Sequence, residues 1–242
     1  MRSFASPEFP TTHWTLVKAV QAGDPAKAAE AMESLCRGYW YPIYAFLRRS
    51  GHRSEDAEDL TQSFFVQLVT EDALQRVRQE AGRLRSYLLG VLKRILSDHQ
   101  RHASTVKRGG GRAPLSFEAM SAEERYSHEP VDDKDPEWLF TRAWAGEVVE
   151  VARQRLRESF QENDQGAVYE ALLPFITWSD EPPSYRAIAT ELGTSLTSTR
   201  IQIFRLRARF RTMLEEEVAR TVLSPAEVAE EMALLHAALA EK

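Results

Sequence analysis

The amino-acid sequence predicts an all-α protein with two small helical domains, joined by a flexible linker and followed by a C-terminal helix. Apolar residues recur at helical spacing on both sides of an aperiodic segment rich in glycine and acids. The 242 residues, 43% of them hydrophobic, suffice for one core or two small ones. We therefore expect helical domains over residues 12–103 and 141–214, a linker over 104–140, and an extension over 215–242.

The first domain opens with two expected short helices, over residues 12–21 and 26–35, separated by a turn that contains glycine and proline. Cys36, the single cysteine of the chain, excludes an internal disulfide and suggests a small buried residue in a reducing cytosol. A dense group of aromatic residues follows, and we expect it to form a core. Its members are Tyr39, Trp40, Tyr41, Tyr44 and Phe46.

A firm helix is expected over residues 54–69, where Ser54 is a candidate N-cap and acids occupy the first turn. Its apolar stripe consists of Ala57, Leu60, Phe64 and Leu68. Off this stripe, an acidic and polar surface consists of Glu55, Asp59, Gln62 and Ser63. A solvated helix face is the simpler interpretation of these residues.

A long basic amphipathic helix is expected over residues 82–102, and its cationic side suits a phosphate backbone. The net charge of the whole chain is −5, but the charges are unevenly distributed. Residues 82–112 hold eight Lys and Arg against Asp98, a local charge of +7, and residues 113–140 hold eight acids against two bases, a charge of −6. The glycines and acids of 104–140 favour an extended linker, either a passive spacer or a segment with a role in binding.

Residues 184–211 form the pattern of two helices joined by a tight turn. Tyr185, Ile188, Ala189 and Leu192 share one helical face, Gly193 suits a helix C-terminus, and Ser195 is a candidate N-cap for the second helix. In that second helix, the expected inward residues are Thr199, Ile203, Leu206 and Phe210. The expected outward residues of its early turns are Thr197, Ser198, Arg200, Ile201, Gln202 and Arg205.

These outward side chains suit a DNA major groove, where arginine binds guanine, glutamine binds adenine, and aliphatic groups meet thymine methyls. An ordinary pair of helices with a solvated basic face is the alternative.

Two apolar-periodic helices, within residues 144–160 and 168–176, are expected to pack behind this unit. At the C-terminus, Ser224 and Glu227 form a capping box that begins an acidic helix through Ala240. This helix either completes a small core, or it masks the basic helix-turn-helix or binds a regulator.

Three of these segments resemble bacterial sigma factors of the extracytoplasmic-function (ECF) class, in the sigma-70 group. Residues 56–65 are similar to the part of region 2 that docks on core RNA polymerase, and 82–102 to the part that opens and reads the −10 promoter element. Residues 184–211 are similar to the helix-turn-helix of region 4, which reads the −35 element. The resemblance implies a sigma factor that directs promoter-specific initiation, with core polymerase and promoter DNA as partners and an anti-sigma factor or other regulator as a further one.

The resemblance and the residue pattern together predict three sets of site residues. The set for docking on polymerase is Asp56, Asp59, Gln62 and Ser63. The set for the −10 element is Arg83, Arg85, Tyr87, Lys93, Arg94 and Arg101, of which Arg94 stands where many family members carry asparagine. The set for the −35 element is Thr197, Ser198, Arg200, Ile201, Gln202, Phe204 and Arg205.

Other function classes fit the sequence less well. A helix-turn-helix regulator that binds duplex DNA without polymerase is the main alternative. An RNA-binding module is a third class, but the sequence lacks the aromatic sheet surface expected of one. The six histidines are scattered without metal-ligand spacing, so we expect no enzyme activity, no metal and no cofactor. No apolar run reaches the ~20 residues of a membrane span, and the N-terminus lacks the apolar core of a signal peptide. We therefore expect a cytoplasmic protein that is associated with the nucleoid when it is bound to polymerase.

Overall fold

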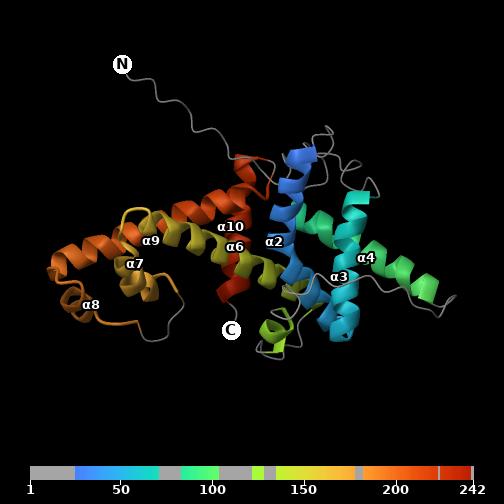
Figure 1. Cartoon of the computed structure of the whole chain (residues 1–242), viewed down its shortest axis with the longest axis horizontal. Helices are drawn as coiled ribbons and strands as arrows, with labels where there is room; N and C mark the ends of the chain where they lie inside the picture. Colours follow the sequence, from blue (N-terminus) through green and yellow to red (C-terminus); the bar gives the residue numbers. More distant parts are fainter. Residues whose placement is uncertain are drawn as a thin grey trace, which may run out of the picture. The chain divides into compact units, whose positions relative to one another are not determined.

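The computed structural model describes residues 25–70, 83–103, 122–127, 135–177, 182–222 and 224–240. All regular elements in these ranges are helices, which confirms the all-α prediction (Figure 1). The expected helix over residues 12–21 lies outside the described part of the chain.

The chain divides into two compact units whose boundaries differ from the expected domains. The first unit takes its described residues from Met1–Glu147 and Ala219–Lys242, and the second is Val148–Val218. The second unit is therefore inserted in sequence between two parts of the first. The expected C-terminal extension belongs to the first unit, together with the helices that resemble region 2.

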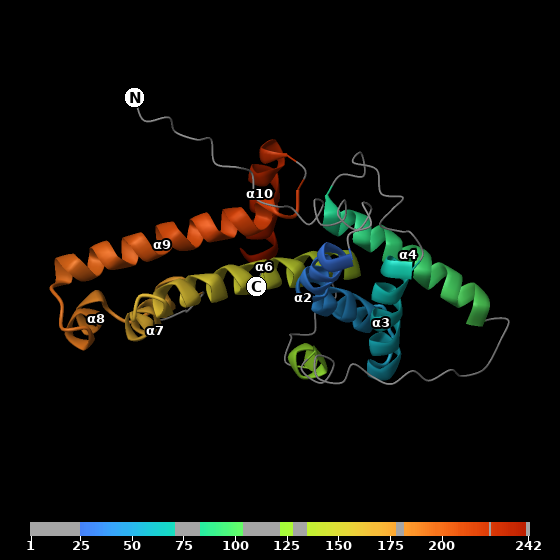
Figure 2. The same cartoon turned by 45° about the horizontal axis from the view of Figure 1, so that its top comes forward.

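The first unit contains α2 (Pro25–Arg49), α3 (Ser54–Thr70), α4 (Leu84–Ala103), the start of α6 (Pro136–Gln161) and α10 (Pro225–Ala240). Helix α2 runs without a break from the expected short helix through the aromatic cluster, although Pro42 removes one backbone donor inside it. Helices α2 and α3 pack against each other, as Figure 2 shows.

The aromatic cluster forms the core of the first unit, as the sequence predicts. Tyr39 and Tyr44 are each 1% exposed, and the ring of Trp40 stacks on Phe65 with centroids 5.6 Å apart. Gly51 ends the turn after α2 with a φ of 91°, a backbone conformation that glycine adopts without strain. Cys36 is half-buried, rather than fully buried as expected.

The start of α3 differs in one detail from the expected N-cap. Ser54 is the first residue of the helix, and its Oγ lies 3.0 Å from the Tyr44 Oη instead of capping the backbone. The carbonyl of the preceding residue, Arg53, accepts the N–H of Ala57 at 2.8 Å. The hydroxyl of Ser54 thus joins α3 to α2.

The second unit contains the rest of α6, α7 (Gly166–Leu172), the short η2 (Leu173–Phe175), α8 (Tyr185–Glu191) and α9 (Leu196–Ala219). Of the two helices expected behind the helix-turn-helix, residues 156–160 and 168–176 contribute to the core there, whereas Trp144 belongs to the first unit. The buried cluster consists of Leu156, Phe160, Tyr169, Leu172, Phe175, Ile188, Ile203 and Leu206. Tyr185, on the same helical face as the buried Ile188, is 37% exposed and lies beside the Phe175 ring, with centroids 5.3 Å apart.

Two parts of the expected flexible linker are helical: residues 122–127, and residues 136–140 at the start of α6. The segment 122–127 is held on α2 by side-chain contacts. The Glu123 carboxylate accepts hydrogen bonds from Tyr44 Oη and, at 3.0 Å, from Arg48 Nη2, and the Arg125 guanidinium lies 3.7 Å from the centroid of the Tyr41 ring. For these residues the expectation of an extended linker is wrong, because the aromatic and basic side chains of α2 provide partners that composition does not reveal.

Candidate functional site

The outer face of α3 carries the four residues predicted to dock on polymerase. Asp56, Asp59 and Ser63 are exposed, and Gln62 is half-buried. On the opposite face, Ala57 and Phe64 are fully buried against the core. Helical periodicity therefore separates an anchoring face from a free acidic face of the same helix.

The acidic face of α3 concentrates negative charge. Burial raises the pKa of Glu58, and the neighbouring charges of Asp59 and Glu55 raise it further. These carboxylates repel one another in the folded protein. The Nε2 of Gln62 is buried without a hydrogen-bond partner among the described residues.

Helix α4 is amphipathic, with Leu84, Leu88 and Leu92 fully buried. On its other side Lys93 and Arg94 are exposed, and Lys93 forms an ion pair with Glu137. Tyr87 is half-buried. Burial raises the pKa of its phenol, and the charge of Arg94 acts in the opposite direction.

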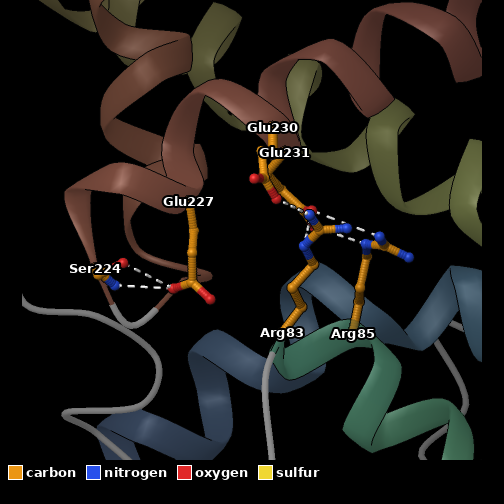
Figure 3. A network of polar contacts seen from close by, with 6 residues as sticks. All are labelled: Arg83, Arg85, Ser224, Glu227, Glu230 and Glu231. Atoms are coloured by element: carbon orange, nitrogen blue, oxygen red, sulfur yellow. Dashed lines mark hydrogen bonds and ion pairs between the residues drawn. The ribbon is translucent and has the colours of Figure 1, made fainter.

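The remaining predicted −10 residues differ in their surroundings. Arg101 lies near the C-terminal end of α4, and its side chain is outside the described part of the chain. Arg83, directly before α4, and Arg85, in its first turn, are partly buried. Both form ion pairs with glutamates of α10, as Figure 3 shows.

Gly193 and Ser195 end α8 and cap α9 as the sequence predicts, and Ser184 caps α8 in addition. Ser184 Oγ accepts the N–H of Ala187 at 3.1 Å, and Gly193 adopts a φ of 62° after α8. Ser195 Oγ accepts the N–H of Ser198 at 3.1 Å, at the start of α9. These local contacts set the turn between the two helices.

The N-terminal turns of α9 present most of the predicted −35 residues to solvent. Phe204 is 73% exposed and Ile201 is 46% exposed, which is unusual for large apolar side chains. Ser198 and Gln202 are half-buried, and the Gln202 Oε1 is buried without a hydrogen-bond partner among the described residues. The exposed set is Thr197, Arg200, Ile201, Phe204 and Arg205.

The inward residues of α9 are also as predicted. Thr199 is fully buried, and Ile203 and Leu206 are 2% and 1% exposed. Phe210 is half-buried against the same core. The helix thus presents a mixed face of arginine, hydroxyl and apolar groups while its other face is anchored.

Glu231 was not among the predicted site residues, although the sequence holds a signal for it. It lies three residues after Val228 and four before Leu235, so helical spacing places it on the same face as these two apolar residues. An acid on an apolar stripe requires a buried cationic partner. The sequence does not say that the partners are Arg83 and Arg85, which lie 148 and 146 residues earlier by residue number.

Among the described helices, none is both long enough and apolar enough to span a bilayer. The comparisons with known proteins give one family match. Residues 37–105 match the model of sigma-70 region 2, a stretch that includes the acidic face of α3 and the basic side of α4. No curated protein and no solved structure matches the chain. The match shows a likeness to sigma-70 region 2 over residues 37–105, which lie within the first unit.

Proposed function

We propose that this protein is an ECF-class sigma factor that binds core RNA polymerase and directs it to specific promoters. The observation that carries the proposal is the region 2 match over residues 37–105. Within that stretch, α3 is anchored by one face and leaves Asp56, Asp59 and Ser63 exposed on the other. This free acidic face is the proposed docking surface for polymerase.

The proposed promoter contacts lie on two separate helices. In α4 the exposed Lys93 and Arg94, with the partly buried Tyr87, contact the −10 element. Opening that element requires unstacking bases, at a cost of a few kcal/mol each, which positive charge and aromatic stacking offset. Bond formation in the RNA belongs to the polymerase, so the sigma factor itself performs no catalysis.

Helix α9 is the proposed reader of the −35 element in duplex form. Its capped N-terminus and exposed Arg200 and Arg205 suit the major groove, where arginine forms paired hydrogen bonds with guanine. The exposed Ile201 and Phe204 suit the methyl groups of thymine. An anti-sigma factor or another regulator is a further proposed partner, and the cytoplasm and nucleoid are the proposed location.

The docking surface is tested by reconstitution with core polymerase. Asp59→Arg reverses a charge at the centre of the acidic face, so we expect loss of core binding and of promoter-directed transcription with the fold intact. Glu33→Arg is the matched control, because Glu33 is an exposed acid on α2, outside the region 2 match. Its core binding is expected to equal that of the wild type.

Circular dichroism of Asp59→Arg establishes that the variant remains folded. Unchanged core binding by a folded Asp59→Arg protein would contradict the docking surface. If the wild-type chain binds duplex DNA alone and never associates with core polymerase, the helix-turn-helix regulator is the correct function. Footprinting of the reconstituted holoenzyme upstream of its own gene then identifies the promoter elements.

A further inference from the structure

The start of α4 is joined to α10 by a compact set of ion pairs. Glu231 accepts Arg85 Nε at 2.6 Å, and its other oxygen lies 3.0 Å from Arg83 Nε (Figure 3). Glu230 accepts Arg83 Nη2 at 2.7 Å. Two carboxylates thus engage both arginines that the sequence assigned to the −10 element.

These contacts are covered to different degrees. The Glu231 side chain is 1% exposed and that of Arg85 is 12% exposed, so this pair is removed from solvent. The Arg85 guanidinium also lies 5.5 Å from the centroid of the Trp144 ring. Arg83 and Glu230 lie closer to the edge, with 30% and 70% exposure. The cluster therefore has a buried centre and an accessible rim.

Helix α10 also has contacts that do not involve these charges. The Ser224 backbone N–H donates to Glu227 Oε2 at 3.0 Å, which is one half of the expected capping box. Leu84 N–H, at the start of α4, donates to the Thr221 carbonyl at 3.4 Å. The apolar residues of α10 that are buried are Met232, Leu235 and Ala238.

A carboxylate and a nucleic-acid phosphate are equivalent partners for arginine. Both accept charge-assisted, paired hydrogen bonds from a guanidinium group, so they compete for the same donors. Arg83 directly precedes, and Arg85 lies in the first turn of, the helix whose exposed basic residues are proposed to follow promoter DNA. While Glu230 and Glu231 hold them, these two arginines are withheld from phosphate.

We propose that α10 is an autoinhibitory segment, in which Glu230 and Glu231 occupy a phosphate-binding site formed by Arg83 and Arg85. The inference rests on the proposed function, since it adds a regulated site to the same DNA-binding helix. Displacement of the two carboxylates exposes both arginines to the DNA backbone. The segment therefore lowers the affinity of the free protein for promoter DNA.

A purely structural pairing makes a different prediction. In that case Arg83 and Arg85 serve only to neutralise Glu231, and their release adds nothing to DNA binding. Buried ion pairs often contribute little net stability, so the presence of this cluster does not decide between the two roles. A double-mutant cycle that measures DNA binding distinguishes the two roles.

The experiment uses the full-length chain and a fluorescent forked DNA duplex as the probe. Glu230→Gln with Glu231→Gln weakens the pairing, and we expect about a tenfold gain in affinity at moderate salt. Two added phosphate contacts should also steepen the dependence of log affinity on log salt by about 1 to 2. In a background with Arg83→Ala and Arg85→Ala, the same glutamine changes should produce no gain.

The arginine-deficient background separates released arginines from a change in net charge. If the gain persists there, or if the glutamine variant shows none, autoinhibition by this contact is wrong. Glu33→Gln removes one exposed acid that pairs with Arg37 elsewhere in the unit, and it is expected to change affinity less than Glu230→Gln alone.

Folding and the proposed function are checked on the same samples. If the change at the buried Glu231 prevents folding, the cycle is run with Glu230→Gln and Arg83→Ala, whose side chains lie at the exposed rim, with a gain of a few fold expected. Core polymerase binding is measured in parallel. If no protein binds core, the sigma-factor proposal fails whatever the DNA cycle shows, whereas normal core binding without a gain rejects autoinhibition alone.

Discussion

Thr199 illustrates how one residue sets the start of the proposed recognition helix. It is fully buried, its Oγ1 donates to the Ser195 carbonyl at 3.1 Å, and it lies 2.9 Å from the Thr194 Oγ1. Because the Thr199 hydroxyl donates to the carbonyl, it accepts from Thr194. The hydroxyl thus links the turn to the first turn of α9.

Thr199→Val keeps the side-chain shape and removes both hydrogen bonds. We expect the free energy of unfolding to fall by about 1 kcal/mol, the usual net value of a hydrogen bond in a protein. Urea denaturation measures this change. Thr197→Val, at an exposed position of the same turn, should change stability by less than about 0.5 kcal/mol. Equal effects of the two substitutions would mean that the buried hydroxyl has no special role.

Arg205 is the residue-scale test of DNA reading by α9. If this exposed arginine binds a base, Arg205→Ala should lower the affinity for the −35 element by about 1 to 3 kcal/mol and relax sequence preference at one position. Arg211→Ala is the control, since Arg211 is exposed on the same helix and pairs with Glu215. Fluorescence anisotropy with promoter variants compares the two, and an equal loss for every DNA sequence would assign Arg205 to the backbone instead.

At the scale of elements, the docking of segment 122–127 on α2 depends on a buried phenol. Tyr44 donates to the Glu123 carboxylate and accepts from Ser54, whose Oγ lies 3.0 Å away. Burial and the bond to Glu123 raise the pKa of Tyr44 to about 12, from an ordinary value of 10.0. The folded protein therefore favours the protonated phenol.

This shift predicts a dependence of stability on pH. The contribution of Tyr44 is fully present below pH 10, the ordinary pKa, and is lost as the pH rises through about 12. Tyr44→Phe should therefore make the fall of unfolding free energy between these pH values shallower. At pH 8 the variant should be less stable by about 1 kcal/mol, because the hydroxyl contacts are absent. Urea denaturation across this pH range is the measurement, and identical pH profiles would contradict the assignment.

Most helices of the described chain follow from local sequence signals. The stripes of α3 and α9 bury the residues that their periodicity predicts, except for the half-buried Phe210, since neighbours three and four apart share a helix face. The extent of α2 and the helix at 122–127 were not predicted correctly. A proline inside α2 and the acids of the linker indicate breaks, but tertiary packing on the aromatic cluster outweighs these local preferences.

At the scale of the whole molecule, the first unit is discontinuous in sequence and takes α10 from beyond the inserted second unit. Leu235, in α10, is fully buried. Leu235→Ala should therefore lower the stability of the first unit by about 2 to 5 kcal/mol. Leu239→Ala, at a half-buried position of the same helix, should cost less.

Hydrogen exchange locates the effect of Leu235→Ala. Amides of α3 and α4 should lose protection if α10 is part of their cooperative unit. A variant in which only α10 exchanges faster would show that the helix adds little to the rest of the unit. That result would leave the ion pairs of Glu231 as the main link between α10 and α4.

By itself, the sequence determined the all-α class, the turn and cap between α8 and α9, the acidic face of α3 and the basic side of α4. Periodicity, caps and charge patterns extend over a few neighbouring residues, so they can be recognised in the sequence alone. Only the tertiary structure decided that α10 belongs with the first unit and that Glu230 and Glu231 engage Arg83 and Arg85. Arg85 and Glu231 are 146 residues apart, and such a pairing depends on how distant helices pack, which no local pattern encodes.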